Sequence, residues 1–252
     1  MTKKRLALKI AAGVGALLLI AFCAFAAMSF LGNPLSAWLS KNTAQSYANK
    51  TYSHQSWTAQ ESNYNFKWGT YVVRLSSGEN IDERFTVEVR GGEIMSDTYQ
   101  QDIVEYGAVR WRIAEEYDKE IRPLLDQIMG KEKHTSYLSP HFFETVPTEG
   151  ITHGMPLSEQ AVNSCGIELM VRTAASSPDA KTGASLLKQV QQTLQANAYE
   201  PPYYYLVLEP EKPKDKGLSA QISREQLTEM DETALAEFLE NANPFADTKE
   251  QE

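Results

Sequence analysis

Four histidines are the residues in this sequence best suited to bind a metal ion or to transfer a proton. They are His54, His134, His141 and His153, and imidazole is a common zinc ligand. Their spacings match no zinc signature, and the sequence contains neither an HExxH helix nor a CxxC pair. We therefore expect no metal and no cofactor, and we interpret these histidines as solvated or hydrogen-bonded loop residues.

Nucleophilic chemistry has equally little support. Cys165 could be an exposed thiol beside Gly166, but free cysteine is most often buried, so we expect burial. The other cysteine, Cys23, lies in an apolar run, which leaves the rest of the chain without a partner for an internal disulfide. No G-x-S-x-G serine occurs, and no phosphate-binding glycine loop occurs outside residues 10–31.

Paired carboxylates are the remaining catalytic candidates. Glu115, Glu116 and Asp118 lie on an expected helix, and glycoside hydrolysis uses two carboxylates at a set distance. Charges interleaved with lysine on a helix usually form a solvated face, however. We therefore predict no catalytic residues and expect a protein that is not an enzyme.

Aromatic residues point to binding more than to catalysis. The chain has four tryptophans and a Tyr203-Tyr204-Tyr205 run, more than one small sheet must bury. Strand alternation places Tyr204 on the face opposite its two neighbours. The candidate binding aromatics are Trp68, Tyr203, Tyr204 and Tyr205; the alternative is that these rings fill a core and keep only their polar tips at its margin.

The composition allows one large or two ordinary domains, because 252 residues with 42% hydrophobic side chains can form a sizeable core. All charges in residues 1–31 are basic, and the remaining 221 residues carry 20 basic and 33 acidic groups. This acidic balance is a poor match to nucleic acid or to anionic lipid headgroups, so no nucleic-acid partner is expected.

The segment from Ile10 to Leu31 has 22 residues without a charge. As a helix it would extend ~33 Å, close to the ~30 Å hydrocarbon core of a bilayer. Residues 10–31 are therefore predicted to be an uncleaved transmembrane helix. A cleaved signal peptide with its processing site at Ala24-Phe25-Ala26 is the alternative. Lipid attachment at Cys23 is disfavoured because the bulky Phe22 precedes it.

Orientation follows from the basic residues, which precede the segment and do not recur until Lys41. By the positive-inside rule, residues 1–9 are cytoplasmic and the C-terminal domains are extracytoplasmic. The expected localisation is the cell membrane, with the lipid bilayer as partner through residues 10–31.

A short joint follows this segment, in the sequence GNPLS at 32–36. Gly32 is expected to end the span, Asn33 to cap the next helix, and Pro34 to occupy its first turn. We call Gly32, Asn33 and Pro34 the membrane-proximal elbow. Beyond it, Leu35, Trp38, Leu39 and Tyr47 form a helical stripe that needs a partner.

Two strands follow that helix, since alternating apolar residues predict one over 70–75 and another over 85–90. The aromatics of 57–66 suggest an earlier strand, and a tight turn leads into 93–95. A long helix should start after Ser96-Asp97 and break or kink at Pro123. The first domain is thus an α-β-β-β-α module over 32–130.

The second domain is predicted over 141–242, after a linker at 131–140 and before a flexible tail at 243–252. Strands are expected at 166–171, 203–208 and 218–222, the second at an edge because two prolines open it. A helix begins near Asp179, and a capping box of Ser223 and Gln226 begins the last one. The fold class is α+β: a single transmembrane helix, then two small modules of helices packed on antiparallel sheets.

Several stretches resemble the YfjL-like family of membrane-anchored bacterial proteins. They are GNPLS after the apolar segment, the run 64–67 with Gly69 and Tyr71, the run 82–85, and Gly92 with Asp97 and Tyr99. The resemblance is best over 30–100. It implies a bacterial cell surface and this domain layout, and it carries over no catalytic residues because the family has no assigned activity.

These observations predict a non-catalytic, single-pass protein that binds or senses a protein or peptide partner in the cell envelope. Two alternatives stay open. One is an envelope enzyme, a carboxylate-dependent hydrolase of wall polymer. The other is a structural or assembly subunit, which would show a large exposed apolar patch.

Overall fold

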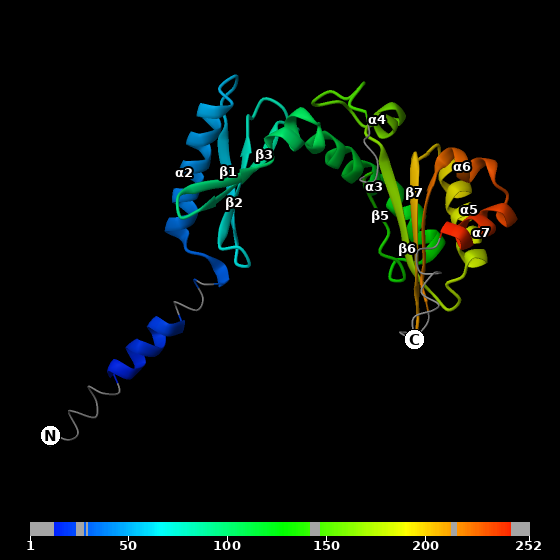
Figure 1. Ribbon diagram of the computed structural model, residues 1–252, viewed down its shortest axis with the longest axis horizontal. Helices are drawn as coiled ribbons and strands as arrows, with labels where there is room; N and C mark the ends of the chain where they lie inside the picture. Colours follow the sequence, from blue (N-terminus) through cyan, green and yellow to red (C-terminus); the bar gives the residue numbers. More distant parts are fainter. Residues whose placement is uncertain (1–12, 24–27, 29, 142–146, 213–215, 243–252) are drawn as a thin grey trace, which may run out of the picture. The chain divides into compact units, whose positions relative to one another are not determined.

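The computed structural model describes residues 13–23, 28, 30–141, 147–212 and 216–242 (Figure 1). The chain is a mixed α+β protein with two four-stranded sheets, divided into a first unit, Met1–Val104, and a second unit, Glu105–Glu252. No helix within the described ranges is long and apolar enough to cross a membrane. The expected cytoplasmic residues 1–9 and tail 243–252 lie outside those ranges, as do 10–12, 24–27 and 29 of the expected span.

The first unit is built on an antiparallel meander. Its strands are β1 (Thr58–Asn65), β2 (Thr70–Ser76), β3 (Arg84–Arg90) and β4 (Glu93–Asp97), paired in chain order. Val73, Leu75, Phe85, Val87 and Val89 are fully or almost fully buried. The alternation read from the sequence is therefore confirmed, because the apolar set of each strand faces one core.

Helix α2 (Pro34–Thr51) runs along this sheet (Figure 1). Its contact face is Ser40, Ala44 and Ala48, all buried. The prediction that Leu35, Trp38 and Leu39 form the packing stripe is wrong, since these side chains are 63%, 58% and 48% exposed. Small residues at every fourth position bring the helix backbone close to the sheet, so the larger side chains of its first turns lie outside.

The boundary between the units lies after Val104, not after residue 130. A π-helix, η1 (Gln100–Val104), follows β4, and Tyr106 then adopts a left-handed φ of 58°. This turn interrupts the helix expected from residue 97, so α3 (Gly107–Met129) starts later and belongs to the second unit. It continues past Pro123 to its C-cap.

The second sheet has the order β5-β6-β7-β8, formed by Tyr137–Pro140, Ile167–Ala175, Tyr203–Pro210 and Leu218–Ser223. It is mixed and not purely antiparallel, because β6 and β7 pair in parallel. The connection between them contains α5 (Ala180–Ala196), the kind of crossover that parallel neighbours require. Two further expectations are wrong: β7 is central and not an edge strand, and residues 131–140 include β5 and are not merely a linker.

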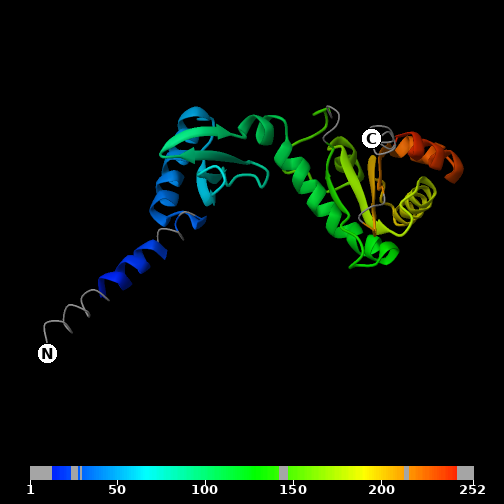
Figure 2. The same cartoon turned by 60° about the horizontal axis from the view of Figure 1, so that its bottom comes forward.

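Helices cover one face of this sheet. Residues of α3, α5 and α7 join Leu169, Tyr204 and Leu206 in a single buried cluster, and α5 and α7 lie side by side (Figure 2). The capping box of Ser223 and Gln226 is present, but it starts a short helix, α6 (Arg224–Glu229), which ends before α7 (Glu232–Ala242). A short α4 (Glu159–Ser164), which the sequence did not indicate, precedes β6.

Candidate functional site

The helix start that the sequence predicts at the elbow is confirmed. The Asn33 side chain accepts hydrogen bonds from the backbone N–H groups of Leu35 and Ser36, at 2.9 and 3.2 Å, and Pro34 opens α2. Gly32 has a φ of 73°, a conformation that glycine adopts without strain. The start of α2 is therefore encoded in three adjacent residues.

The sheet holds this elbow from the side, which the sequence did not reveal. The Tyr71 hydroxyl accepts from the Asn33 N–H at 2.7 Å and lies 3.2 Å from the Asn33 carbonyl oxygen. A Cβ atom on Gly32 would lie 2.7 Å from the Cβ of Tyr64, so the backbone passes directly over that side chain. The elbow is thus a packed and hydrogen-bonded part of the first unit, and not a loose tether.

The candidate aromatics fall in both units. Trp68, in the β1–β2 turn of the first unit, is 67% exposed. In the second unit Tyr204 is 1% exposed, inside the core, while Tyr203 and Tyr205 are half-buried on the other face of β7. The alternation is confirmed; the binding role of these rings stays a prediction, and burial removes Tyr204 from a surface that could bind.

Tyr203 covers a buried polar cluster that the sequence did not indicate. Its ring stacks on His141, with centroids 4.2 Å apart. His141 Nδ1 lies 3.0 Å from the Oε2 of Glu168, and the Gln221 amide donates to the same oxygen at 2.5 Å. His141 and Glu168 are 4% and 2% exposed. The three residues come from positions up to 80 apart in the chain, so no local spacing could have shown them.

The other three histidines each contact a neighbouring side chain, and His153 lies beside Tyr106 with ring centroids 5.0 Å apart. His134 Nε2 lies 3.0 Å from Asp126 Oδ1, and His54 Nε2 lies 3.1 Å from the Tyr99 hydroxyl. The predicted burial of Cys165 is confirmed at 0% exposure. Within the part of the chain that the structure describes, no group of three or more His, Cys, Asp or Glu residues is placed to hold a metal ion.

Two of the candidate carboxylates on α3 form ion pairs within that helix. Glu116 pairs with Arg112 at 3.2 Å. Asp118 pairs with Arg122 at 2.6 Å and accepts from the backbone N–H of Leu138 at 3.1 Å, which ties α3 to β5. The sequence predicted a solvated face for these carboxylates; the Glu116 and Asp118 side chains are 37% and 21% exposed.

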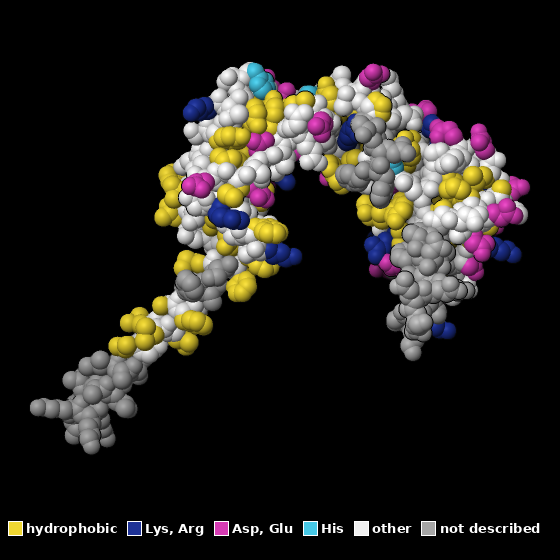
Figure 3. Space-filling model, viewed as in Figure 1, with side chains coloured by type: hydrophobic (Ala, Val, Ile, Leu, Met, Phe, Trp, Pro, Cys, Tyr) yellow, Lys and Arg dark blue, Asp and Glu magenta, His cyan; other side chains and the backbone are white. Residues whose placement is uncertain are grey.

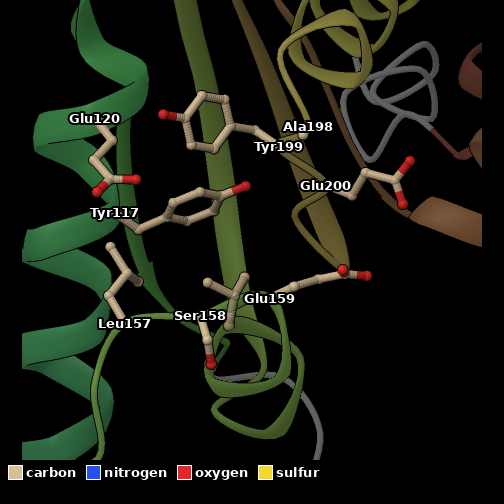
Figure 4. Close-up of a pocket in the computed structure, with 9 residues that line it drawn as sticks. Tyr117, Glu120, Leu157, Ser158, Glu159, Ala198, Tyr199 and Glu200 are labelled. Atoms are coloured by element: carbon tan, nitrogen blue, oxygen red, sulfur yellow. The ribbon is translucent and has the colours of Figure 1, made fainter.

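A pocket of about 220 Å³ lies in the second unit, between α3, the start of α4 and the turn after α5 (Figure 4). Tyr117 and Tyr199 meet inside it with ring centroids 5.6 Å apart. Figure 4 shows the Glu120 carboxylate on one side of the two rings and the Glu159 and Glu200 carboxylates on the other. Two strands and two helices lie between the two tyrosines in the sequence, so this pairing was not predictable.

The wall of the pocket includes a strained backbone position. Ala198 has a φ of 61°, in the left-handed region that favours glycine. The Tyr199 N–H donates to the Leu194 carbonyl at 2.9 Å and thereby holds the turn that aims Tyr199 at Tyr117. The Ala198 N–H donates to the Gln195 carbonyl at 3.0 Å, so the two bonds together close the end of α5 in a common helix C-terminal motif.

The chemistry of this pocket suits binding. Burial raises the pKa of the Tyr117 phenol well above its ordinary value, so the group stays neutral and does not act as a base. Ser158 accepts from the Ala161 N–H as the cap of α4, and none of the described residues that line the pocket is a histidine, cysteine or lysine. Aromatic rings flanked by carboxylates are complementary to a ligand that carries a positive group.

One known protein family is similar in sequence to the first unit of this chain. Residues 7–102 match the family model described as YfjL-like, N-terminal domain. The match ends close to the unit boundary after Val104. Searches of curated proteins and of solved structures found no match. The match confirms the resemblance seen in the sequence: residues 7–102 are similar to the N-terminal domain of the YfjL-like family.

Proposed function

We propose that this protein is a membrane-anchored, non-catalytic binding or sensing protein of the bacterial cell envelope. Residues 10–31 cross the bilayer, residues 1–9 are cytoplasmic, and the two units lie outside. One observation supports the membrane anchor. Five large apolar side chains of the N-terminal segment are helical and between 63% and 68% exposed: Leu17, Leu18, Leu19, Ile20 and Phe22. An uninterrupted apolar surface of this kind marks an interaction with lipid or protein.

The binding site is the pocket between Tyr117 and Tyr199. Glu120 and Glu159 are exposed to solvent, whereas the general acid of a glycosidase needs a desolvated carboxyl group. The environment of these carboxylates therefore favours recognition of a cationic group on a protein or peptide over hydrolysis of wall polymer. An assembly role is the second candidate, because apolar side chains are also exposed around the elbow.

Photo-crosslinking in intact cells tests the binding function. A photoreactive residue at Glu159, in the pocket, should give one reproducible adduct that Tyr199→Ala removes. The same residue at Glu132, exposed in the second unit but outside the pocket, is the matched control. Equal crosslinking at both positions, or none at Glu159, would argue against the pocket as the binding site.

A further inference from the structure

We infer that the outer surface around the elbow binds a phospholipid bilayer, at the boundary between the headgroups and the hydrocarbon. This inference rests on the proposed membrane anchor. The surface, here called the seat, consists of large apolar side chains that are 48–67% exposed. They are Phe30, Leu35, Trp38, Leu39, Phe66 and Trp68.

A contact with the N-terminal segment determines how deep in the bilayer the β1–β2 turn would lie. The rings of Phe30 and Phe66 lie with centroids 6.1 Å apart. Phe30 belongs to the last turn of the apolar run that ends at Leu31. If that run is in the hydrocarbon, Phe66 must lie at its edge, because the two rings are in contact. Trp68 is two residues further along the same turn.

The exposed side chains of α2 lie at a matching height. Leu39 follows Pro34 by five residues, which is ~7.5 Å along a helix axis. The polar layer of one leaflet is about 5–7 Å thick, the difference between a bilayer with and without its headgroup regions. The first turns of α2 therefore stay within reach of that layer, which explains why Trp38 is exposed on a face that nothing within the described first unit covers.

Polar groups at the turn suit a phospholipid headgroup. Lys67 lies between Phe66 and Trp68 and is exposed, and the Arg90 guanidinium donates to the Trp68 carbonyl at 2.7 Å. Glu93, paired in register with Arg90, offsets one of these charges. The nearly balanced charge fits a zwitterionic headgroup, and tryptophan beside basic residues is typical of membrane interfaces.

The exposed apolar side chains are concentrated at this end of the first unit. Figure 3 shows yellow side chains along the N-terminal segment and around the base of this unit. In the β2–β3 connection, at the other end of the strands, Ile81 is 64% exposed. That position provides a control matched in exposure but remote from the elbow.

Quenching of tryptophan fluorescence by brominated lipid tests the seat. The full chain is reconstituted in phosphatidylcholine vesicles, with or without bromine on the acyl carbons nearest the headgroup. Trp38 and Trp68 should lose most of their emission, so Trp38→Phe and Trp68→Phe should each reduce the quenchable fraction. Buried Trp57 should contribute nothing to it, and Ile81→Trp should add emission that the brominated lipid does not quench.

The results of flotation and quenching together distinguish the proposed seat from the proposed membrane anchor. Flotation with vesicles after a urea wash, together with quenching of Trp68, supports both. Flotation with Trp68 unquenched overturns the seat and leaves the anchor intact. If Trp68 is also blue-shifted in that case, a second copy or another protein covers this surface and not lipid. Failure to float overturns the anchor itself.

Discussion

Replacing Glu168 by alanine should lower the free energy of unfolding of the second unit by about 3–5 kcal/mol, the usual effect of removing one partner from a buried polar pair. The Glu168 carboxylate is 2% exposed and lies within hydrogen-bonding distance of both His141 and Gln221. In the variant, the His141 and Gln221 side chains stay buried but lose this hydrogen-bonding partner. Water cannot replace it, because the side chains remain inside the sheet.

Hydrogen exchange read by mass spectrometry measures this effect for each unit separately. Peptides from β6 to β8 should lose protection by roughly 10²–10⁴-fold, while peptides from the first unit should not change. Glu209→Ala is the matched control, because Glu209 pairs with Arg172 on the same sheet but is 47% exposed. That variant should cost about 1 kcal/mol or less. An equally small loss for Glu168→Ala would mean that the buried cluster contributes no more than a surface pair.

Replacing Gly32 by valine should destabilise the first unit by about 2–5 kcal/mol, through a left-handed φ and overpacking together. The new Cβ would lie 2.7 Å from the Tyr64 Cβ and 2.9 Å from the Tyr71 hydroxyl. The elbow must then move away from the sheet, and the hydrogen bond from the Asn33 N–H to Tyr71 is lost.

Gly69 separates the two causes. It has a φ of 64° and no atom within 4 Å of an added Cβ, so Gly69→Val adds backbone strain without the clash. Hydrogen exchange in β1 to β3 should show a clearly larger loss of protection for Gly32→Val. Equal losses in the two variants would show that the sheet does not hold the elbow.

Features encoded by neighbouring residues could be predicted from the sequence. Asn33 followed by Pro34 defines a helix start, and the alternation around Val73 and Val87 defines half-buried strands, because cap chemistry and side-chain period act within a few residues. The same holds for the capping box at Ser223. These signals located most of the strands and the elbow.

Features that depend on distant contacts could not be predicted. The packing face of α2 was predicted wrongly because the residues that contact the sheet include Ala44 and Ala48. These small side chains are only weakly hydrophobic, so the sequence pattern favoured the larger ones. The parallel pairing of β6 with β7 and the pocket between Tyr117 and Tyr199 join segments far apart in the chain. Side-chain pattern specifies which face of a strand is buried, but not which strand lies beside it.

Thiol labelling in intact cells tests the central claim, a bilayer-spanning N-terminal segment with both units outside. Cys23 lies in the apolar segment and Cys165 is fully buried, so neither should react with a membrane-impermeant maleimide. A thiol introduced by Glu232→Cys, at the exposed start of α7, should react before lysis. Labelling at position 232 in intact cells, with Cys23 reacting only after the membrane is dissolved in detergent, is the predicted result. Labelling at position 232 only after lysis, or of Cys23 in undisturbed membranes, would contradict the account.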